Sequence, residues 1–193
     1  MSRSKMRIAP EKKVIFFGAK TFNDERKGFK YLLEALKIVK DLLADNPGLA
    51  DKVHLLIAGE ETEKFKDELP FEYSNLGLLN NSDGVASAYQ VADIYLCPSI
   101  EDAGPSMVNQ SIMCGTPVVS FAQGVSLDLV ISGKTGYLAK LHDSADMAKG
   151  ICEILKMTDE EHMQMKKNCR DTAMELYHPD VSINKWLEIL KAG

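Results

Sequence analysis

The sequence predicts an α/β protein built on a single doubly wound parallel sheet, with extra helices at its carboxyl-terminal end. Two observations lead to this fold class. Short apolar runs bounded by glycine or proline alternate with segments whose apolar residues recur at helical spacing. The last third of the chain shows helical spacing alone. Such alternation is typical of buried parallel strands joined by helical crossovers.

The strands are predicted from runs that are short, rich in β-branched residues and apolar on both faces. A further run is expected to form a strand, and another, entered through a glycine turn, to form a short edge strand. The four continuous runs are residues 14–18, 53–59, 94–99 and 116–121, the further strand is 73–79 and the edge strand is 133–140.

The helices are predicted from the apolar spacing between these strands and after them. Thr158 and Glu161 form a capping box, the sequence signature of a helix start. His178 and Pro179 separate the last two helices. The predicted helices are residues 27–44, 83–91, 105–114, 144–155, 158–177 and 181–190.

Composition limits the class of protein. A chain of 193 residues with 45% hydrophobic content suits one domain, which we place at residues 13–193 after a linker or disordered segment at 1–12. A formal net charge of -5 argues against a nucleic-acid partner. The chain starts without the apolar run of a secretory signal and has no apolar stretch of about 18 residues, so we expect a cytoplasmic protein.

The sequence shows no arrangement of metal ligands. Its four cysteines form no CxxC pair, and its four histidines are scattered. We therefore expect reduced cysteines that pack in the interior and no metal site.

Chemistry is expected in the loops that follow the strands, because open parallel sheets bind ligands beyond the carboxyl ends of their strands. The loops concerned are residues 18–28, 59–70 and 99–106. The third loop lies within the stretch CPSIEDAGPSMVNQSIMCGTPVVSF, in which two acids and a Gly-Pro pair precede a helix.

The Gly-Pro pair predicts an anion site. Gly104 suits a helix N-cap and Pro105 the first helical position, so the amides from Ser106 onward point outward from a partly positive helix end. Gln110 lies roughly 6–7 Å further along the axis, at about 1.5 Å per residue. That spacing matches the distance from a nucleotide diphosphate to its ribose, whose hydroxyls a Gln amide can bind.

The two acids before the helix, Glu101 and Asp102, are expected to bind the hydroxyls of an attached sugar. The alternative is that Asp102 only caps the helix and that Gln110 is an ordinary solvated residue.

The first loop, GAKTFNDERKG, strengthens the ligand hypothesis. It holds Lys20, Arg26 and Lys27 at a predicted helix start, where cations are unfavourable for the helix dipole unless an anion lies nearby. A solvated basic turn balanced by Asp24 and Glu25 is the alternative. Neither GxxxxGK[ST] nor GxGxxG occurs, so the P-loop and the common dinucleotide site are not favoured.

With these motifs the sequence resembles the carboxyl-terminal, nucleotide-sugar-binding domain of retaining GT-B glycosyltransferases, the group 1 class also called glycosyltransferase family 4. This domain is Rossmann-like. The resemblance covers nearly the whole chain in five ordered blocks: VIFFGAKTFNDERKGFKYLLEAL, HLLIAGEE, NLGLL followed by AYQVADIYLCPS, EDAGPSMVNQSIMCGTPVVSF, and LVISGKTGYLAK.

The resemblance also assigns catalytic residues. The family's E-x7-E motif falls on Asp102 and Gln110, so both acids are replaced. It implies that Asp102, or Glu101 by a shift of one residue, faces the donor sugar, and that Gln110 holds the ribose. Lys27 matches the Lys of the family's KG dipeptide, which contacts the donor phosphates. These three, Asp102, Glu101 and Lys27, are the expected catalytic residues.

The remaining donor-binding positions are carried over in the same way. The Arg expected after Gly18 is Ala19 here, so Lys20 or Arg26 takes its place. The loop that receives the diphosphate is identified with the backbone of Gly104, Pro105 and Ser106, and the segment that flanks the nucleobase includes Leu78 and Leu79.

The function implied is transfer of a sugar from a nucleoside diphosphate sugar to a hydroxyl acceptor, in glycan or surface polysaccharide synthesis, without a further cofactor. An amino-terminal acceptor domain of this class is not present in these residues. We therefore expect a donor-binding half that is inactive alone and needs that domain or a partner chain, through which it is peripheral to a membrane. The alternatives are a non-catalytic binding or assembly module, suggested by the two replaced acids, and a sugar-nucleotide epimerase.

Overall fold

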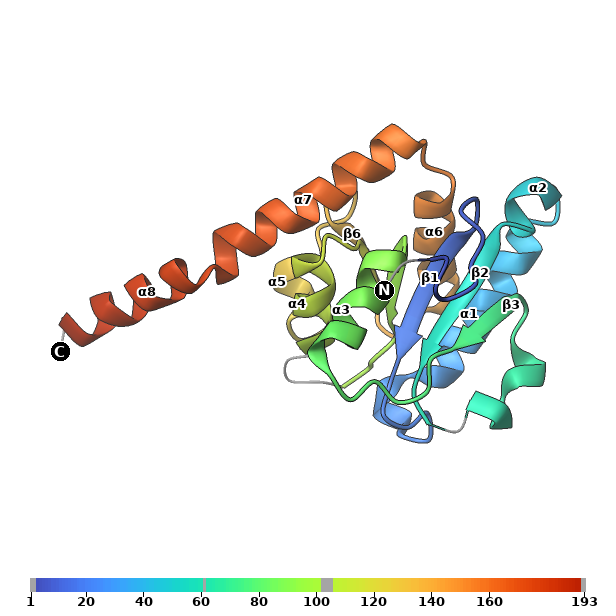
Figure 1. Ribbon diagram of the computed structural model, residues 1–193, viewed down its shortest axis with the longest axis horizontal. Helices are drawn as coiled ribbons and strands as arrows, with labels where there is room; N and C mark the ends of the chain where they lie inside the picture. Colours follow the sequence, from blue (N-terminus) through green and yellow to red (C-terminus); the bar gives the residue numbers. More distant parts are fainter. Residues whose placement is uncertain (1–2, 61, 102–105, 192–193) are drawn as a thin grey trace.

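The structure, a computed structural model, describes residues 3–60, 62–101 and 106–191, and within them forms one parallel sheet (Figure 1). The strand order is β3-β2-β1-β4-β5-β6, which confirms the predicted doubly wound class. The strands are β1 (Lys13–Gly18), β2 (Val53–Ala58), β3 (Glu72–Asn75), β4 (Ile94–Cys97), β5 (Val118–Phe121) and β6 (Gly136–Ala139).

The order of the strands marks where a ligand would bind. From β1 the chain moves outward to β2 and β3, then returns to place β4 beside β1 and continues outward to β5 and β6. The carboxyl ends of β1 and β4 therefore flank the point at which the strand order reverses. In open α/β sheets this is the crevice in which ligands bind.

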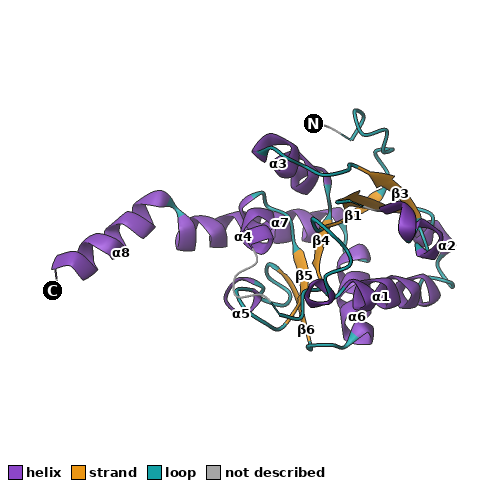
Figure 2. Ribbon diagram, turned by 90° about the horizontal axis from the view of Figure 1, so that it is seen from below, coloured by secondary structure: helices purple, strands orange, loops and turns teal. Residues whose placement is uncertain are grey.

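Helices cover both faces of the sheet, as Figure 2 shows from below. The core between the sheet and α1 and α6 contains side chains such as Phe17 and Leu36, and the core on the α3 and α4 face contains Phe16 and Val108. Alternate residues of β1 enter opposite cores because successive strand side chains point to opposite faces. The helices are α1 (Phe29–Leu42), α2 (Pro47–Ala50), α3 (Ser82–Val91), α4 (Ser106–Met113), α5 (Ser126–Leu129), α6 (Ser144–Leu155), α7 (Asp159–Tyr177) and α8 (Pro179–Lys191), with 3₁₀ turns η1 (Glu25–Lys27), η2 (Thr62–Lys64) and η3 (Lys66–Glu68).

Most elements differ from the predicted ranges by one to three residues at an end, and local turns explain two of the differences. The helix predicted over 27–44 begins at Phe29, since Gly28 adopts a left-handed conformation with φ of 66° and ends the η1 turn. The strand predicted over 73–79 ends at Asn75, whose side chain accepts a hydrogen bond from the amide of Gly77. The capping box of Thr158 is confirmed.

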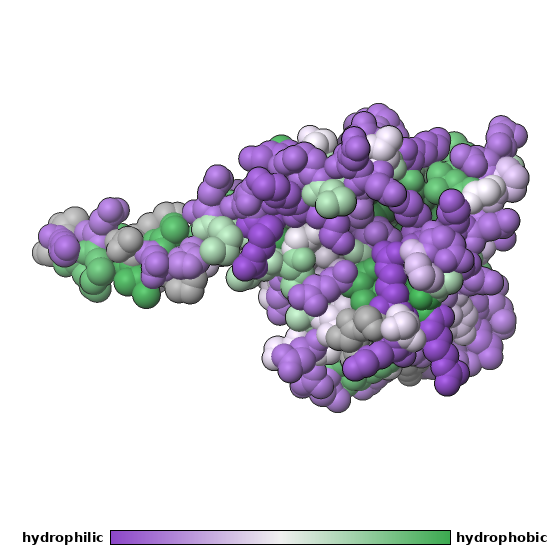
Figure 3. All heavy atoms as spheres, turned by 45° about the horizontal axis from the view of Figure 1, so that its top comes forward, coloured by the Kyte–Doolittle hydropathy of each residue, from purple (hydrophilic) through white to green (hydrophobic). Residues whose placement is uncertain are grey.

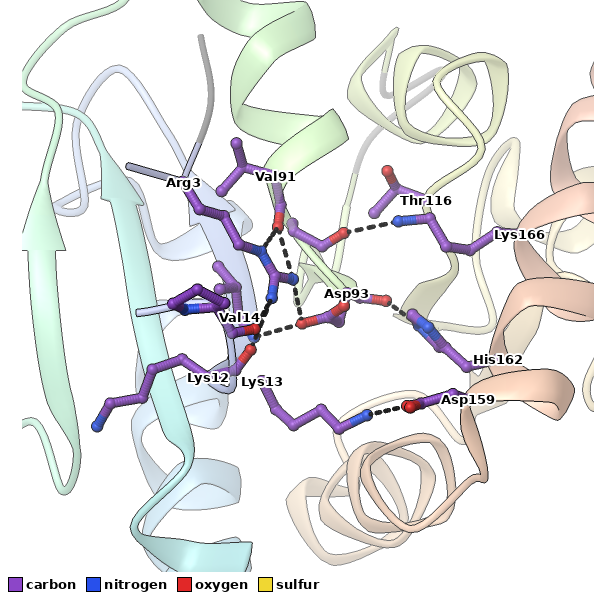
Figure 4. Close-up of polar contacts among 12 residues, drawn as sticks. Arg3, Lys12, Lys13, Val14, Val91, Asp93, Thr116, Asp159, His162 and Lys166 are labelled. Carbon is purple, nitrogen blue, oxygen red and sulfur yellow. Dashed lines mark hydrogen bonds and ion pairs between the residues drawn. The ribbon is translucent and has the colours of Figure 1, made fainter. Parts of the chain in front are cut away.

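The amino-terminal segment differs from the linker or disordered segment expected for residues 1–12. Residues 3–12 pack against the domain, and Ile8 is 3% exposed in the core. The Arg3 guanidinium donates to the carbonyl of Val91 and forms an ion pair with Asp93 at 2.8 Å (Figure 4). A planar group with five donors can satisfy several acceptors at once, so one arginine anchors this segment.

Asp93 joins the amino ends of β1 and β4 to α7 (Figure 4). Its carboxylate accepts a hydrogen bond of 2.7 Å from the amide of Val14, and its carbonyl accepts one of 2.9 Å from Nε2 of His162. Lys166 donates to the carbonyl of Ala92 at 3.3 Å. This edge of the sheet is therefore fixed by hydrogen bonds, while the opposite edge holds the long loops.

The last helix, α8, projects away from the sheet and helices (Figure 1). Figure 3 shows hydrophobic residues along this projecting helix. None of the helices in the described ranges is long and apolar enough to cross a membrane. The exposed apolar side chains of α8 are Ile183, Trp186, Leu187, Ile189 and Leu190.

The buried histidine on α7 predicts that stability falls on acidification. Burial lowers the pKa of His162 from 6.5, although its hydrogen bond to Asp93 and the charge of that residue act the other way, and Lys166 and Lys13 lower it further. The unfolded chain therefore takes up a proton at a higher pH than the folded one, so the stabilisation is full above pH 6.5 and is lost as pH falls toward the folded pKa.

We expect the free energy of unfolding in urea to be smaller at pH 5.5 than at pH 7.5. His162→Gln keeps a side-chain N–H donor and should reduce this difference. An equal pH dependence in the wild type and in His162→Gln would contradict the assignment to this residue.

Candidate functional site

The loops after β1, β2 and β3 lie side by side at the carboxyl edge of the sheet. The amide of Ala19 donates to the carbonyl of Ala58 at 3.0 Å, and the amide of Gly59 donates to the carbonyl of Gly77 at 2.9 Å. These bonds continue the strand pairing past the strand ends. The residues that follow the three strands are thereby brought to one face.

A cavity of about 350 Å³ opens at the ends of β1 and β4, at the point where the strand order reverses. Its polar lining comes from Lys20, Lys27, Ser99 and Ser106. Its apolar lining includes Phe17, Phe22, Phe29, Leu96 and Pro98. Two cationic side chains and the first residue of α4 thus share one hollow above an apolar floor.

Two further cavities continue this hollow along α4. One, of about 230 Å³, shares Lys20 and Met107 with the first cavity and adds Leu78 and Gln110. Another, of about 490 Å³, lies between α3 and α4 and also contacts Gln110. The cavities therefore form a row from the Lys27 turn to the amino end of α3.

Most of the predicted binding residues meet at this row of cavities. Gly18, Lys20, Lys27 and Ser106 line the first, and Gly18, Lys20, Leu78 and Gln110 line the second. Glu101 is exposed and is not among the lining residues of these cavities. Asp102, Gly104 and Pro105 lie outside the described residues.

Arg26 is directed to a different partner. Its guanidinium donates to both carboxylate oxygens of Asp24, at 3.1 and 2.8 Å, and it does not line the cavities of this row. The hydrogen bond from this guanidinium holds the pKa of the Asp24 carboxyl below its usual value. Of the two residues expected to replace the missing arginine at Ala19, Lys20 is the one that faces the cavity.

The turn that carries Lys27 crosses the loop after β4 at close range. The carbonyl of Arg26 accepts a hydrogen bond of 2.8 Å from the amide of Ile100. On the other side of Lys27, a side chain at Gly28 would overlap the carbonyl oxygen of Pro98. Both neighbours of Lys27 are thus fixed against the loop that leads into α4, which explains a glycine directly after the lysine.

Helix α4 presents two kinds of polar group to the cavities. Its first residue, Ser106, lines the first cavity, where the amides of a helix start point outward and carry partial positive charge. Gln110 lies roughly 6 Å further along the axis, at about 1.5 Å per residue, and lines the second cavity. Ser106 and Gln110 therefore line different cavities of the row at the separation along α4 that the sequence predicts.

Two features of the site were not predicted from the sequence. Met107 lines both the first and the second cavity, and its position three residues before Gln110 places both on one helix face, a signal that could have revealed it. Phe22 and Phe29 have ring centroids 4.8 Å apart and close the base of the Lys27 loop. They are seven residues apart, but no helix spans this stretch, because the η1 turn ends in the left-handed Gly28 and α1 begins only at Phe29, so a helical period does not explain the contact.

The site offers charge, amides and an amide side chain as binding groups. Within the ranges that the structure describes, no group of three or more His, Cys, Asp or Glu side chains could hold a metal ion. The two lysines and the α4 amides suit a polyanion such as a diphosphate, because charge-assisted hydrogen bonds are strong where water is partly excluded.

Comparison with protein families gives one match over most of the chain. Residues 2–172 match the family described as "Glycosyl transferases group 1". An uncharacterized glycosyltransferase of Haemophilus influenzae is 28% identical over 169 residues, which are 85% of this chain and 45% of that protein. A D-inositol 3-phosphate glycosyltransferase of Geodermatophilus obscurus is 27% identical over 165 residues, 80% of this chain and 36% of that protein. The chain thus spans less than half the length of these relatives.

Solved structures share the fold. HepE of Anabaena in complex with UDP and glucose has a TM-score of 0.74 at 18% identity, covering 99% of this chain and 51% of that chain. Sucrose-phosphate synthase of Thermosynechococcus elongatus has a TM-score of 0.75 at 20% identity, covering 98% and 48%. These likenesses show the fold, and this chain spans about half the length of each of these two solved chains.

The crossing at Gly28 leads to a prediction on stability. Gly28→Ala should lower the free energy of unfolding by more than the roughly 1–2 kcal/mol that a left-handed conformation costs a residue with a side chain, because the added carbon also meets Pro98. The measurement is urea unfolding followed by circular dichroism.

Gly77→Ala is the matched control. Gly77 has a similar φ of 63° but no atom within 4 Å of an added carbon, so this variant should show the conformational cost alone. Equal losses in the two variants would contradict a close contact between Gly28 and Pro98.

Proposed function

The chain belongs to the family of glycosyl transferases group 1, and we propose that it is the donor-binding half of a retaining glycosyltransferase of glycosyltransferase family 4. The proposed reaction moves a sugar from a nucleoside diphosphate sugar to a hydroxyl acceptor. One observation carries the proposal: Lys27 and the first residue of α4 line a single cavity where the strand order reverses.

The diphosphate would lie in this first cavity. Lys27 and Lys20 supply positive charge from the first loop, and the amides at Ser106 supply donors from α4. In the reaction, negative charge grows on the diphosphate as its bond to the sugar breaks. Donors that are already in place stabilise that charge more than they stabilise the bound substrate, which is how they accelerate transfer. The proposal needs no further cofactor.

The nucleoside would occupy the next cavities along α4. Gln110 can donate to one ribose hydroxyl and accept from another, and Leu78 flanks the same cavity. Support comes from related structures, since HepE is described in complex with UDP and with UDP-glucose. A neutral amide replaces the family's acid here, so we expect a weaker grip on ribose than a carboxylate would give.

The sugar would face the loop that contains Glu101 and Asp102. We assign one of these carboxylates to the sugar hydroxyls, as expected from the sequence motif. For retention, the acceptor oxygen attacks the anomeric carbon on the face from which the diphosphate departs. The departing diphosphate can take the proton that the acceptor hydroxyl loses.

A second half is proposed to complete the enzyme, either on a longer chain or on a partner chain. The chain spans 45% of the Haemophilus influenzae relative and 51% of HepE. The apolar face of α8, with Trp186 at 66% exposure, has the character of a surface that another structure covers. We propose that this half carries the acceptor site, and with it a role in glycan or surface polysaccharide synthesis at the membrane. The cytoplasmic location stays a prediction.

A non-catalytic binding or assembly module is the second candidate, and Gln110 in place of the family's acid favours it. Such a module would keep the fold and pair with another chain through the apolar face of α8, and it would not bind the nucleotide donor. Nucleotide binding therefore separates the two candidates.

Calorimetry with UDP, GDP and ADP tests the donor-binding proposal. The wild-type chain should bind at least one of them. Lys27→Ala should weaken that binding by about 1.5–3 kcal/mol, the scale of a hydrogen bond to a charged group. Gln110→Ala should weaken binding of the same nucleotide but leave pyrophosphate binding unchanged, because Gln110 is proposed to hold ribose.

Lys40→Ala is the control, since Lys40 is an exposed lysine in the last turn of α1, the helix that follows the Lys27 turn. It should leave affinity unchanged. Failure of the wild type to bind any of the three nucleotides would reject the proposal and favour the non-catalytic module.

The face of α8 gives a separate prediction for the isolated chain. Trp186, the one tryptophan in the sequence, should show the red-shifted, readily quenched fluorescence of an exposed indole. Trp186→Ser should change the free energy of unfolding by no more than about 0.5 kcal/mol, as expected for an exposed position. A blue-shifted emission with a large loss of stability would show that α8 packs on this chain and leaves no face for a second half.

A further inference from the structure

The loop that presents Lys27 is organised by an aspartate three residues earlier. We propose that Asp24 is a positioning residue: by capping the η1 turn it holds Lys27 against the loop that leads into α4. The ligand that Lys27 contacts is taken from the proposed function, and the inference concerns how this chain sets that contact.

The cap consists of hydrogen bonds that Asp24 accepts from the backbone amide and the side chain of the residue two positions on. Its Oδ1 accepts from the amide of Arg26 at 3.1 Å, and its carboxylate accepts from the guanidinium at 3.1 and 2.8 Å. The amide of Lys27 donates to the carbonyl of Asp24 at 2.9 Å. Asp24 thus accepts hydrogen bonds from two successive backbone amides, those of Arg26 and Lys27.

This capped turn is also the part of the loop that contacts the loop after β4. The carbonyl of Arg26 accepts a hydrogen bond from the amide of Ile100, and Gly28 lies against the carbonyl of Pro98. Lys27 is the residue between these two contacts. A change in the conformation of the turn would move Lys27 relative to Ser106, which begins α4 and lines the same cavity.

The base of the loop is fixed independently of Asp24. Phe22 and Phe29 contact each other, and each also contacts Phe65, at centroid distances of 4.8 and 4.3 Å. Residues 23–28 therefore form a short loop whose two ends are pinned by aromatic packing. Loss of the cap should loosen the turn without unfolding the domain.

We expect the hydrogen bond from the backbone to Asp24 to fix the position of Lys27 more than the charge of Asp24 does. The Asp24–Arg26 ion pair lies at the surface, with side-chain exposures of 26% and 63%, and such pairs contribute little. An N-cap acceptor matters more because it satisfies an amide that has no partner within the turn. Asparagine keeps that acceptor without the charge, whereas glutamate keeps the charge on a longer arm that fits the cap poorly.

The test compares Asp24→Asn, Asp24→Glu and Asp24→Ala by calorimetry with whichever of UDP, GDP and ADP the wild type binds. We expect Asp24→Ala and Asp24→Glu to lose at least fivefold in affinity and Asp24→Asn to stay within twofold of the wild type. A double variant tests whether Asp24 acts through Lys27. In the Lys27→Ala background, Asp24→Ala should change affinity by less than twofold.

Three results would overturn the inference. Asp24→Asn could lose as much affinity as Asp24→Ala, which would assign the effect to charge. Asp24→Ala could lower affinity by the same factor with and without Lys27, which would show that Asp24 does not act through Lys27. Asp24→Ala could leave affinity unchanged while the wild type binds, in which case the donor-binding proposal stands and this inference fails. Absence of nucleotide binding in the wild type would reject both.

Discussion

The close crossing of two loops, where Gly28 lies against the carbonyl of Pro98, is the constraint on which the candidate site depends. It brings a lysine from the β1 loop to the start of a helix that follows β4. These strands are neighbours in the sheet, but their loops would diverge toward opposite faces without such a contact. The crossing therefore places Lys27 beside the start of α4 at the point where the strand order reverses. The cavity there has positive charge on two sides, from the lysines and from the helix amides.

The amino and carboxyl ends of the strands have different roles because different interactions fix them. At the amino edge, Asp93 and Arg3 join strand ends, the first residues and α7 through direct hydrogen bonds. At the carboxyl edge, backbone bonds such as that from Gly59 to Gly77 align the loops and leave their side chains directed at the cavities. A rigid edge opposite a loop-rich edge is how α/β folds support binding sites.

Much of the fold could be predicted from the sequence because strands and helices have local signals. The apolar run at residues 14–18 and the capping box at Thr158 each depend on a few adjacent residues. Lys27 and Gln110 line the cavities at the expected end of the sheet, because the turn and the helix that carry them follow β1 and β4, but their roles stay a prediction. The pairing of Arg26 with Asp24 matches the alternative that the sequence left open for the basic turn, because the two residues are only two positions apart. The partner of Arg3 was not predicted, because a carbonyl 88 residues away is chosen by tertiary packing, which has no period in the sequence.

The most direct test of the donor-binding proposal is a crystal structure of this chain with a bound nucleoside diphosphate. We expect the terminal phosphate within hydrogen-bonding distance of the Lys27 ammonium and of the backbone amide of Ser106, with the ribose against Gln110. A nucleotide bound at another surface, or a first cavity closed by its own side chains when nucleotide is present, would contradict it.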